Sequence, residues 1–181
     1  MAKLYFKYGT MGAAKSAEAL ICKYRYEEVG KKVLLLKPDK ATRDDEDGKL
    51  TVKSRLGISS DATSLEEFLA GSFLSWAECY DAVILDECQF ATEEQIDMLS
   101  KIVDASGVPV LCYGLKTDSQ TRLFPGSKRL LEIADSISEI KTVCECGKKA
   151  VFNVKTDESE DDITGSYVSV CRRCWKLYYR H

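Results

Sequence analysis

A glycine-containing turn near the N-terminus carries the residue types of a phosphate-binding loop. Its members are Gly9, Thr10, Met11, Gly12, Ala13, Ala14, Lys15 and Ser16. In such loops backbone N–H groups bind phosphate, the lysine reaches the β- and γ-phosphates, and the hydroxyl binds Mg²⁺. The pattern G-x4-G-K-[ST] is met except at Ala14, which we expect to be tolerated if its φ is negative. The loop predicts a site for ATP with Mg²⁺, the alternative being an ordinary strand–helix turn.

Two acidic residues follow a second apolar run, at residues 82–85. Asp86 occupies the position at which phosphate-loop proteins hold Mg²⁺. Ligands gather beyond the carboxyl ends of strands in open α/β sheets, so we expect Asp86 to share a magnesium with Ser16. Glu87 would lie nearby and could accept a proton. The alternative is that both acids begin a solvated loop.

The counts of sulfur and imidazole side chains limit the chemistry further. The 181-residue chain has eight Cys and a single His, which is the last residue, so mechanisms that use a histidine base are excluded. Four cysteines form two close pairs, Cys144-x-Cys146 and Cys171-x2-Cys174. Four thiolates on two tight turns complete a tetrahedral site with no open position for water, which predicts a structural Zn²⁺. The alternatives are redox-active thiols or buried free cysteines.

The segments that carry these residues alternate between strand-like and helix-like patterns. We expect strands at 3–8, 33–36, 82–85 and 108–113, and helices at 15–29, 64–78, 92–107 and 126–135. This order is typical of an α/β fold, a phosphate-loop parallel sheet with helices on both faces. Residues 38–63 read as a long loop with room for a small hairpin. A change in composition near residue 142 predicts two domains, 1–141 for nucleotide binding and 142–181 for zinc.

Two expectations concern packing. The first helix should bury Ala17, Leu20, Ile21 and Tyr24, which recur at helical spacing. The remaining cysteines are interpreted as packing residues: Cys22, Cys79, Cys88 and Cys112.

Composition argues against two classes of partner. Net charge is −3, without the basic excess of a general nucleic-acid binder. No segment has the apolar length that spans a bilayer, and the N-terminus lacks a secretory pattern, so we expect a cytoplasmic protein with no membrane partner. Two other classes stay open at this point: a zinc-ribbon module that binds nucleic acid, and an ATPase switch without a small-molecule acceptor.

The motifs and their order resemble the cytosolic (type II) thymidine kinase family over the whole chain. The resemblance is carried by Lys3-Leu4-Tyr5-Phe6, Met11, Lys15-Ser16, Asp86-Glu87-Cys88-Gln89-Phe90, Cys112-Tyr113-Gly114-Leu115-x-Thr117-Asp118 and Tyr167-Val168-Ser169-Val170-Cys171. It implies transfer of the ATP γ-phosphate to the 5′-hydroxyl of thymidine, and also of deoxyuridine. It further implies feedback inhibition by dTTP and a homotetramer.

The resemblance also implies a role for individual residues. Glu87 matches the catalytic base. The ATP and Mg²⁺ site would comprise residues 9–16 with Arg43, Asp86, Glu87, Cys88 and Gln89. The nucleoside would contact Met11, Phe90, Leu115 and Ser119, and a lasso that includes Ile163, Thr164, Gly165 and Tyr167. The zinc held by the four paired cysteines would clamp the base of that lasso.

Overall fold

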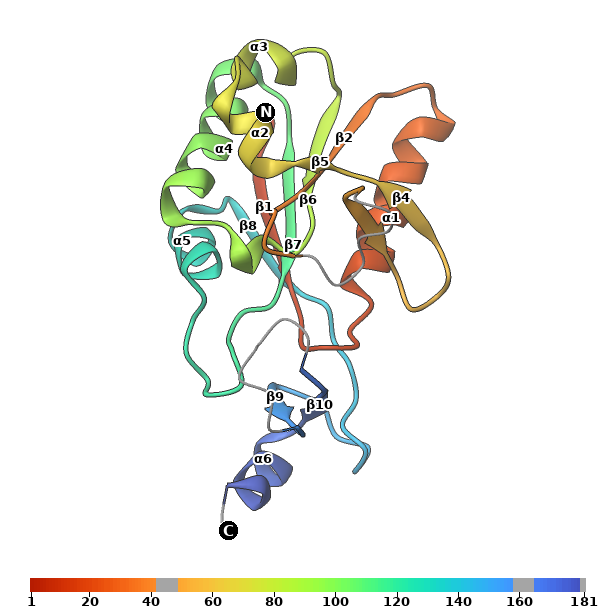
Figure 1. The fold of residues 1–181 in the computed structure, drawn as a ribbon, viewed down its shortest axis with the longest axis vertical. Coiled ribbons are helices and arrows are strands. Elements are labelled where there is room, and N and C mark those ends of the chain that lie inside the picture. Colours follow the sequence, from red (N-terminus) through yellow and green to blue (C-terminus); the bar gives the residue numbers. More distant parts are fainter. Residues whose placement is uncertain (42–48, 158–164, 180–181) are drawn as a thin grey trace.

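A six-stranded parallel sheet forms the centre of the protein, in a computed structural model that describes residues 1–41, 49–157 and 165–179 (Figure 1). The strand order is β5-β2-β6-β7-β1-β8, and each neighbouring pair is parallel. The strands are β1 (Leu4–Tyr8), β2 (Val33–Lys37), β5 (Thr63–Ser64), β6 (Ala82–Leu85), β7 (Val110–Gly114) and β8 (Ser136–Glu139). The predicted parallel sheet is therefore confirmed.

Helices cover both faces of this sheet, as predicted (Figure 1). Leu34 and Leu36 of β2 point to the larger apolar cluster, which includes residues from four helices. These helices are α2 (Leu65–Ala70), α3 (Phe73–Ala77), α4 (Glu93–Ser106) and α5 (Pro125–Ile133). Val33 and Leu35, on the opposite face of the same strand, pack with Ala19 and Leu20 of α1 (Lys15–Glu28). Side-chain alternation along a strand explains the two cores.

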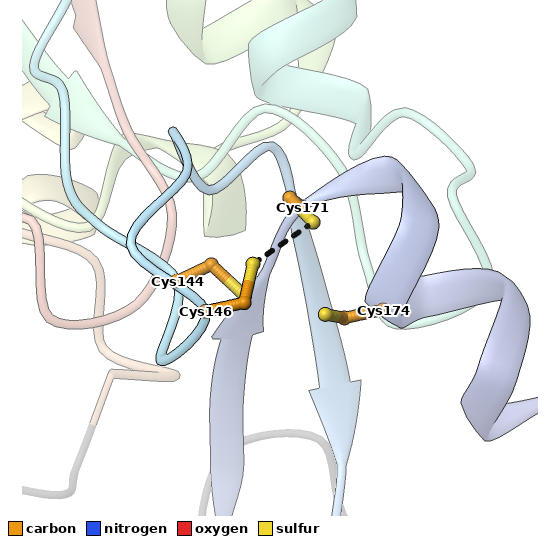
Figure 2. Close-up of side chains that lie close together, drawn as sticks. All are labelled: Cys144, Cys146, Cys171 and Cys174. Atoms are coloured by element: carbon orange, nitrogen blue, oxygen red, sulfur yellow. Dashed lines mark hydrogen bonds between the residues drawn. The ribbon is translucent and has the colours of Figure 1, made fainter.

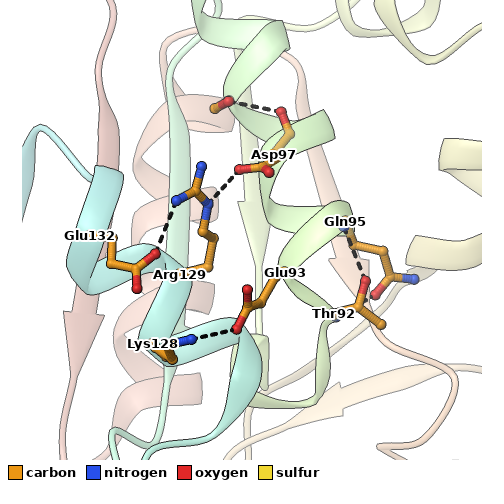
Figure 3. Close-up of polar contacts among 8 residues, drawn as sticks. Thr92, Glu93, Gln95, Asp97, Lys128, Arg129 and Glu132 are labelled. Carbon is orange, nitrogen blue, oxygen red and sulfur yellow. Dashed lines mark hydrogen bonds and ion pairs between the residues drawn. The ribbon is translucent and has the colours of Figure 1, made fainter.

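Polar side chains define the start of α4 and join it to α5 (Figure 3). The predicted capping box is present, with Thr92 Oγ1 accepting from the N–H of Gln95 and Gln95 Oε1 accepting from the N–H of Thr92. Arg129 of α5 pairs with Asp97 of α4 at 2.7 Å, and Lys128 pairs with Glu93 at 3.0 Å. Because α4 follows the acidic end of β6 after a short 3-10 helix η2 (Cys88–Phe90), these caps help to position that end.

Three expectations about local structure are corrected. The helix expected at 64–78 divides at Gly71, where a Cβ would collide with the indole of Trp76. On α1, Ile21 is 39% exposed and Tyr24 is 59% exposed, so the buried face comprises Ala17, Ala19 and Leu20 instead. Cys79 is exposed, so its interpretation as a packing residue is wrong.

The segment between β2 and β5 contains the small hairpin for which the sequence left room. It pairs β3 (Thr51–Lys53) with β4 (Ser59–Asp61) in antiparallel register, and Val52 is buried against the α1 face of the sheet. This packing places the turn of the hairpin, which follows Lys53, beside the start of α1.

The C-terminal part has its own small core beyond the carboxyl ends of the central strands (Figure 1). Strands β9 (Phe152–Lys155) and β10 (Tyr167–Val170) pair antiparallel, and α6 (Arg172–Tyr178) follows. The Phe152 and Trp175 rings stack with centroids 5.0 Å apart. Within the described ranges, no helix is long and apolar enough to cross a membrane.

Candidate active site

The turn between β1 and α1 opens into a cavity of about 250 Å³. Five residues of the predicted phosphate loop line it, together with Glu87 and the turn of the β3–β4 hairpin: Met11, Gly12, Ala14, Lys15, Ser16, Lys53, Ser54, Arg55, Leu56 and Glu87. Lys15 is largely buried, and its Nζ donates to the Thr10 carbonyl at 2.9 Å. The loop therefore encloses its lysine as a phosphate cradle requires.

Ala14 departs from the expected conformation. Its φ is 59° and its ψ is 30°, in the left-handed region, so the condition under which alanine is expected to be tolerated, a negative φ, is not met. An L-residue with a Cβ is strained there, and glycine is the residue that adopts this region freely. The alanine keeps the loop shape that glycine would give, at a cost in backbone energy.

The charges of Lys15, Asp86 and Glu87 lie close enough to interact. Burial, together with the charge of Glu87, raises the pKa of Asp86 to about 7, although a hydrogen bond from the Ser16 hydroxyl opposes the shift. Burial likewise lowers the pKa of Lys15, while Glu87 and Asp86 oppose that shift. The two residues predicted to share Mg²⁺, Ser16 and Asp86, thus face each other. A cation bound there would favour the ionised form of Asp86.

Glu87 is held by a chain of hydrogen bonds. Gln89 Nε2 donates to Glu87 Oε2 at 2.5 Å, and Gln89 Oε1 accepts from the Leu115 N–H at 3.0 Å. Gln89 is fully buried, and Gly114 makes room for it, because a Cβ on Gly114 would lie 2.5 Å from Gln89 Oε1. Glu87 itself has a φ of 52°. These contacts determine where its carboxylate points.

The remaining predicted ATP-site residues that the structure describes do not line this cavity. Gly9 and Thr10 line a small neighbouring pocket that also includes Asn153. Ala13 is buried, and Cys88 is fully buried, which raises its pKa well above the usual thiol value. Arg43 lies outside the described residues.

The predicted nucleoside contacts that the structure describes lie on different elements, each with its own neighbours. Phe90 packs edge-on against Phe124, with centroids 5.9 Å apart. The Leu115 N–H is taken by Gln89, and the Ser119 carbonyl accepts from Tyr179 Oη at 3.1 Å. Gly165 is buried and Tyr167 begins β10. Ile163 and Thr164 lie outside the described residues.

The hairpin turn contributes residues that sequence reasoning missed. Arg55 is exposed at the rim of the cavity, and its charge adds to the lowering of the Lys15 pKa. Ser54 Oγ is buried and has no hydrogen-bond partner among the described residues. No motif marks this turn, and the packing of Val52 against the α1 face of the sheet helps to bring it to the phosphate loop.

The four paired cysteines meet at the base of the β9–β10 hairpin (Figure 2). Their Sγ atoms all lie within 4.8 Å of one another, and Cys146 Sγ is 3.6 Å from Cys171 Sγ. Sulfurs around a tetrahedral zinc, with Zn–S near 2.3 Å, lie roughly 3.8 Å apart, so the cluster fits this ion.

The backbone around the cluster favours ionised ligands. Amides of Cys174 and Arg173 lower the pKa of Cys171 to about 6, with the Cys146 and Cys174 thiols adding to this effect. Amides of Cys146 and Cys171 lower the pKa of Cys144. Hydrogen bonds to the other thiols raise the pKa of Cys174 to about 12. Thiolates are the form that zinc requires, and the ion would supply the charge that ionises the fourth.

A family model described as thymidine kinase matches residues 2–175. The chain belongs to the thymidine kinase family. This membership confirms the resemblance given by the motifs, and it does not favour the zinc-ribbon module or the ATPase switch.

The matches with relatives extend over almost the whole chain. A thymidine kinase of Yersinia pestis is 44% identical over 196 residues, covering 97% of this chain and 95% of the relative. One from Idiomarina loihiensis is 41% identical over 192 residues, covering 97% of each. One from Enterobacteria phage T4 is 42% identical over 188 residues, covering 97% of this chain and 96% of the relative.

A more distant likeness concerns the fold alone. The solved structure of a replication initiator DnaA bound to AMPPCP and single-stranded DNA has a TM-score of 0.50 at 16% identity. The match covers 77% of this chain and 40% of that one. It agrees with a phosphate-loop parallel sheet.

Proposed function

We propose that the chain is an ATP-dependent kinase that phosphorylates the 5′-hydroxyl of thymidine, giving dTMP and ADP, and that it also accepts deoxyuridine. The observation that carries this proposal is the placement of Glu87. Its carboxylate lies at the cavity that holds Lys15 and Ser16, and Gln89 orients it. Phosphoryl transfer needs positioning, charge neutralisation and a base for the attacking hydroxyl, and these residues can supply each.

The residues divide into groups that bind, neutralise and accept a proton. The loop amides and Lys15 hold the phosphates of ATP. Ser16 and Asp86 would hold Mg²⁺, which when bound would supply positive charge that neutralises the phosphates of ATP. Glu87 accepts the proton of the 5′-hydroxyl as that oxygen attacks the γ-phosphorus and ADP leaves. Because the base is a carboxylate, the reaction needs no histidine, and the one histidine of this chain is residue 181.

The C-terminal part, from about residue 142, is proposed as a separate domain that binds zinc and closes over the nucleoside. Cys144, Cys146, Cys171 and Cys174 would hold the ion at the base of the β9–β10 hairpin, whose far end connects through the proposed lasso. Phe90, Leu115 and Tyr167 are proposed to contact the base. Inhibition by dTTP and a homotetramer are further proposals drawn from the family. The ATP donor and the free thiols suit the cytoplasm.

The test is to incubate the zinc-loaded protein with ATP, Mg²⁺ and thymidine and to separate the products. We expect dTMP and ADP in equal amounts. Glu87→Gln should lower kcat about 10²- to 10⁴-fold with nucleoside binding retained. Glu94→Gln, an exposed acid at the start of α4, serves as the matched control and should not change kcat.

Two outcomes would overturn the proposal. The first is folded, zinc-loaded protein that forms no dTMP. The second is ATP hydrolysis that thymidine does not change, which would favour an ATPase switch. If only Glu87→Gln stays within a few-fold of the parent, the kinase activity stands and the base is another residue.

A further inference from the structure

Two side chains of the β9–β10 hairpin hold the phosphate loop through a single residue. The Met11 N–H donates to Asn153 Oδ1 at 2.8 Å, and Ser169 Oγ donates to the Met11 carbonyl at 2.5 Å. Asn153 and Ser169 are directly paired across the two strands, and the Ser169 Oγ lies 3.5 Å from Asn153 Oδ1. One strand pair thus binds both backbone polar groups of Met11.

Because of these bonds, Met11 has a different role from its neighbours in the loop. Because its N–H is taken by Asn153, that N–H does not bind phosphate, although Met11 belongs to the loop. Asn153 is only 4% exposed, so water competes little for this bond. Met11 is an anchor by which the loop is attached to the C-terminal part.

The loop needs such an anchor because its own conformation is costly. Ala14, three residues after Met11, has a φ of 59°, where an L-residue is strained by its Cβ. Strained backbone persists only where the surrounding structure over-determines it. On its other side, the anchor adjoins the cysteine cluster: Ser169 precedes Cys171 by two residues, and Cys144 and Cys171 share a small core with Val154 and Val170, the neighbours of Asn153 and Ser169 along the strands.

We propose that Asn153 and Ser169 are positioning residues that keep the phosphate loop in its ATP-binding shape, and that the metal at the four cysteines supports ATP binding through them. The inference rests on the proposed function in taking ATP as the ligand. It assigns the C-terminal part a second task, besides closing over the nucleoside. The contacts join residues 142 and 158 positions apart in the sequence.

The variants are chosen to remove or keep the two hydrogen bonds to Met11. Asn153→Leu removes the acceptor at similar volume, and Ser169→Ala removes the hydroxyl. Ser169→Thr keeps the hydroxyl and should restore the parent behaviour. Thr156→Val is the matched control, because Thr156 donates within the same hairpin, to the Ser166 carbonyl, and not to the loop.

Two readouts separate positioning from general stability. Hydrogen exchange of the peptide that contains Met11 measures the anchor without any ligand, and calorimetric titration with Mg-ATP measures its consequence. We expect faster exchange in Asn153→Leu and Ser169→Ala, with ATP bound roughly three- to tenfold more weakly. A zinc chelator should speed exchange of the same peptide in the parent and add little in Asn153→Leu.

Several results would overturn the inference: unchanged exchange in both variants, weaker ATP binding in Thr156→Val to the same extent, or full additivity of chelation and Asn153→Leu. If the parent protein does not bind Mg-ATP, the proposed function fails instead, while the exchange measurement still decides whether the anchor exists.

Discussion

Replacing Ala14 with glycine should stabilise this protein, although glycine usually weakens a fold. Ala14 lies at φ 59° and ψ 30°, where an L-residue pays about 1–2 kcal/mol for the crowding of its Cβ. Glycine removes this cost, but it also increases the freedom of the unfolded chain, which costs about 0.4–1 kcal/mol. The difference is about 0–1.6 kcal/mol, which predicts a gain of about 0.8 kcal/mol in the free energy of unfolding.

The neighbouring residue provides the matched control. Ala13 is 4% exposed, and its φ is not in the left-handed region. Ala13→Gly therefore gains no relief of strain. It loses a buried methyl group, worth about 0.8 kcal/mol, and adds the same unfolded-state freedom, for a total loss of about 1–2 kcal/mol. The same chemical change at adjacent positions is predicted to shift stability in opposite directions.

Urea unfolding of the zinc-loaded protein, without nucleotide, measures both variants against the parent. The m-value should stay constant, so that the midpoint reports stability alone. Mg-ATP binding to Ala14→Gly should be no weaker than in the parent, since the loop keeps its shape. If Ala14→Gly destabilises the protein as much as Ala13→Gly does, the left-handed strain at Ala14 does not exist and the reasoning is refuted.

Two further predictions concern the acidic end of β6. Gln89→Leu removes the donor to Glu87, so kcat should fall about 10- to 100-fold while the KM for ATP stays within about threefold; a raised KM at unchanged kcat would make Gln89 a binding residue instead. Because the folded pKa of Asp86 is about 7, above the unfolded value near 4, the folded state binds the extra proton between these values. Its contribution to the free energy of unfolding is therefore present at low pH and is lost as pH rises from about 4 to 7, by up to about 4 kcal/mol. Urea unfolding of the metal-free protein at several pH values in this range should show this loss of stability in the parent but not in Asp86→Asn. Equal slopes of unfolding free energy against pH in the two proteins would contradict the prediction.

Most of the fold and the centre of the site could be predicted from the sequence because their signals are local. Apolar runs define the buried strands, and the capping residues before α4 define its start. The phosphate loop and the pair Asp86-Glu87 are short motifs whose side chains come together because both follow parallel strands. The two cysteine pairs are likewise local, and their spacing is sufficient to indicate a closed metal site.

The features that sequence reasoning missed depend on contacts between distant residues. Strand β8 reads Ser136-Ile137-Ser138-Glu139, with no continuous apolar run, because it lies at the edge of the sheet and, among the described strands, pairs with β1 alone. The break at Gly71 is caused by the ring of Trp76, and the tip of the β3–β4 hairpin reaches the cavity through the packing of Val52. The positive φ of Ala14 could not be predicted from its residue type, because most alanines have negative φ.

The strain in the site explains why these distant contacts matter. Among the described residues, three non-glycine residues have positive φ, and two of them, Ala14 and Glu87, line the same cavity. Each is held by groups from elsewhere in the chain: Gln89 and the Leu115 amide orient Glu87, and Asn153 with Ser169 anchors the loop before Ala14. A site of this kind can be located from its own residues, but its geometry is maintained by the hydrogen bonds of Gln89, Asn153 and Ser169. Substitution of those supports should therefore impair the reaction without removing any group that touches the substrates.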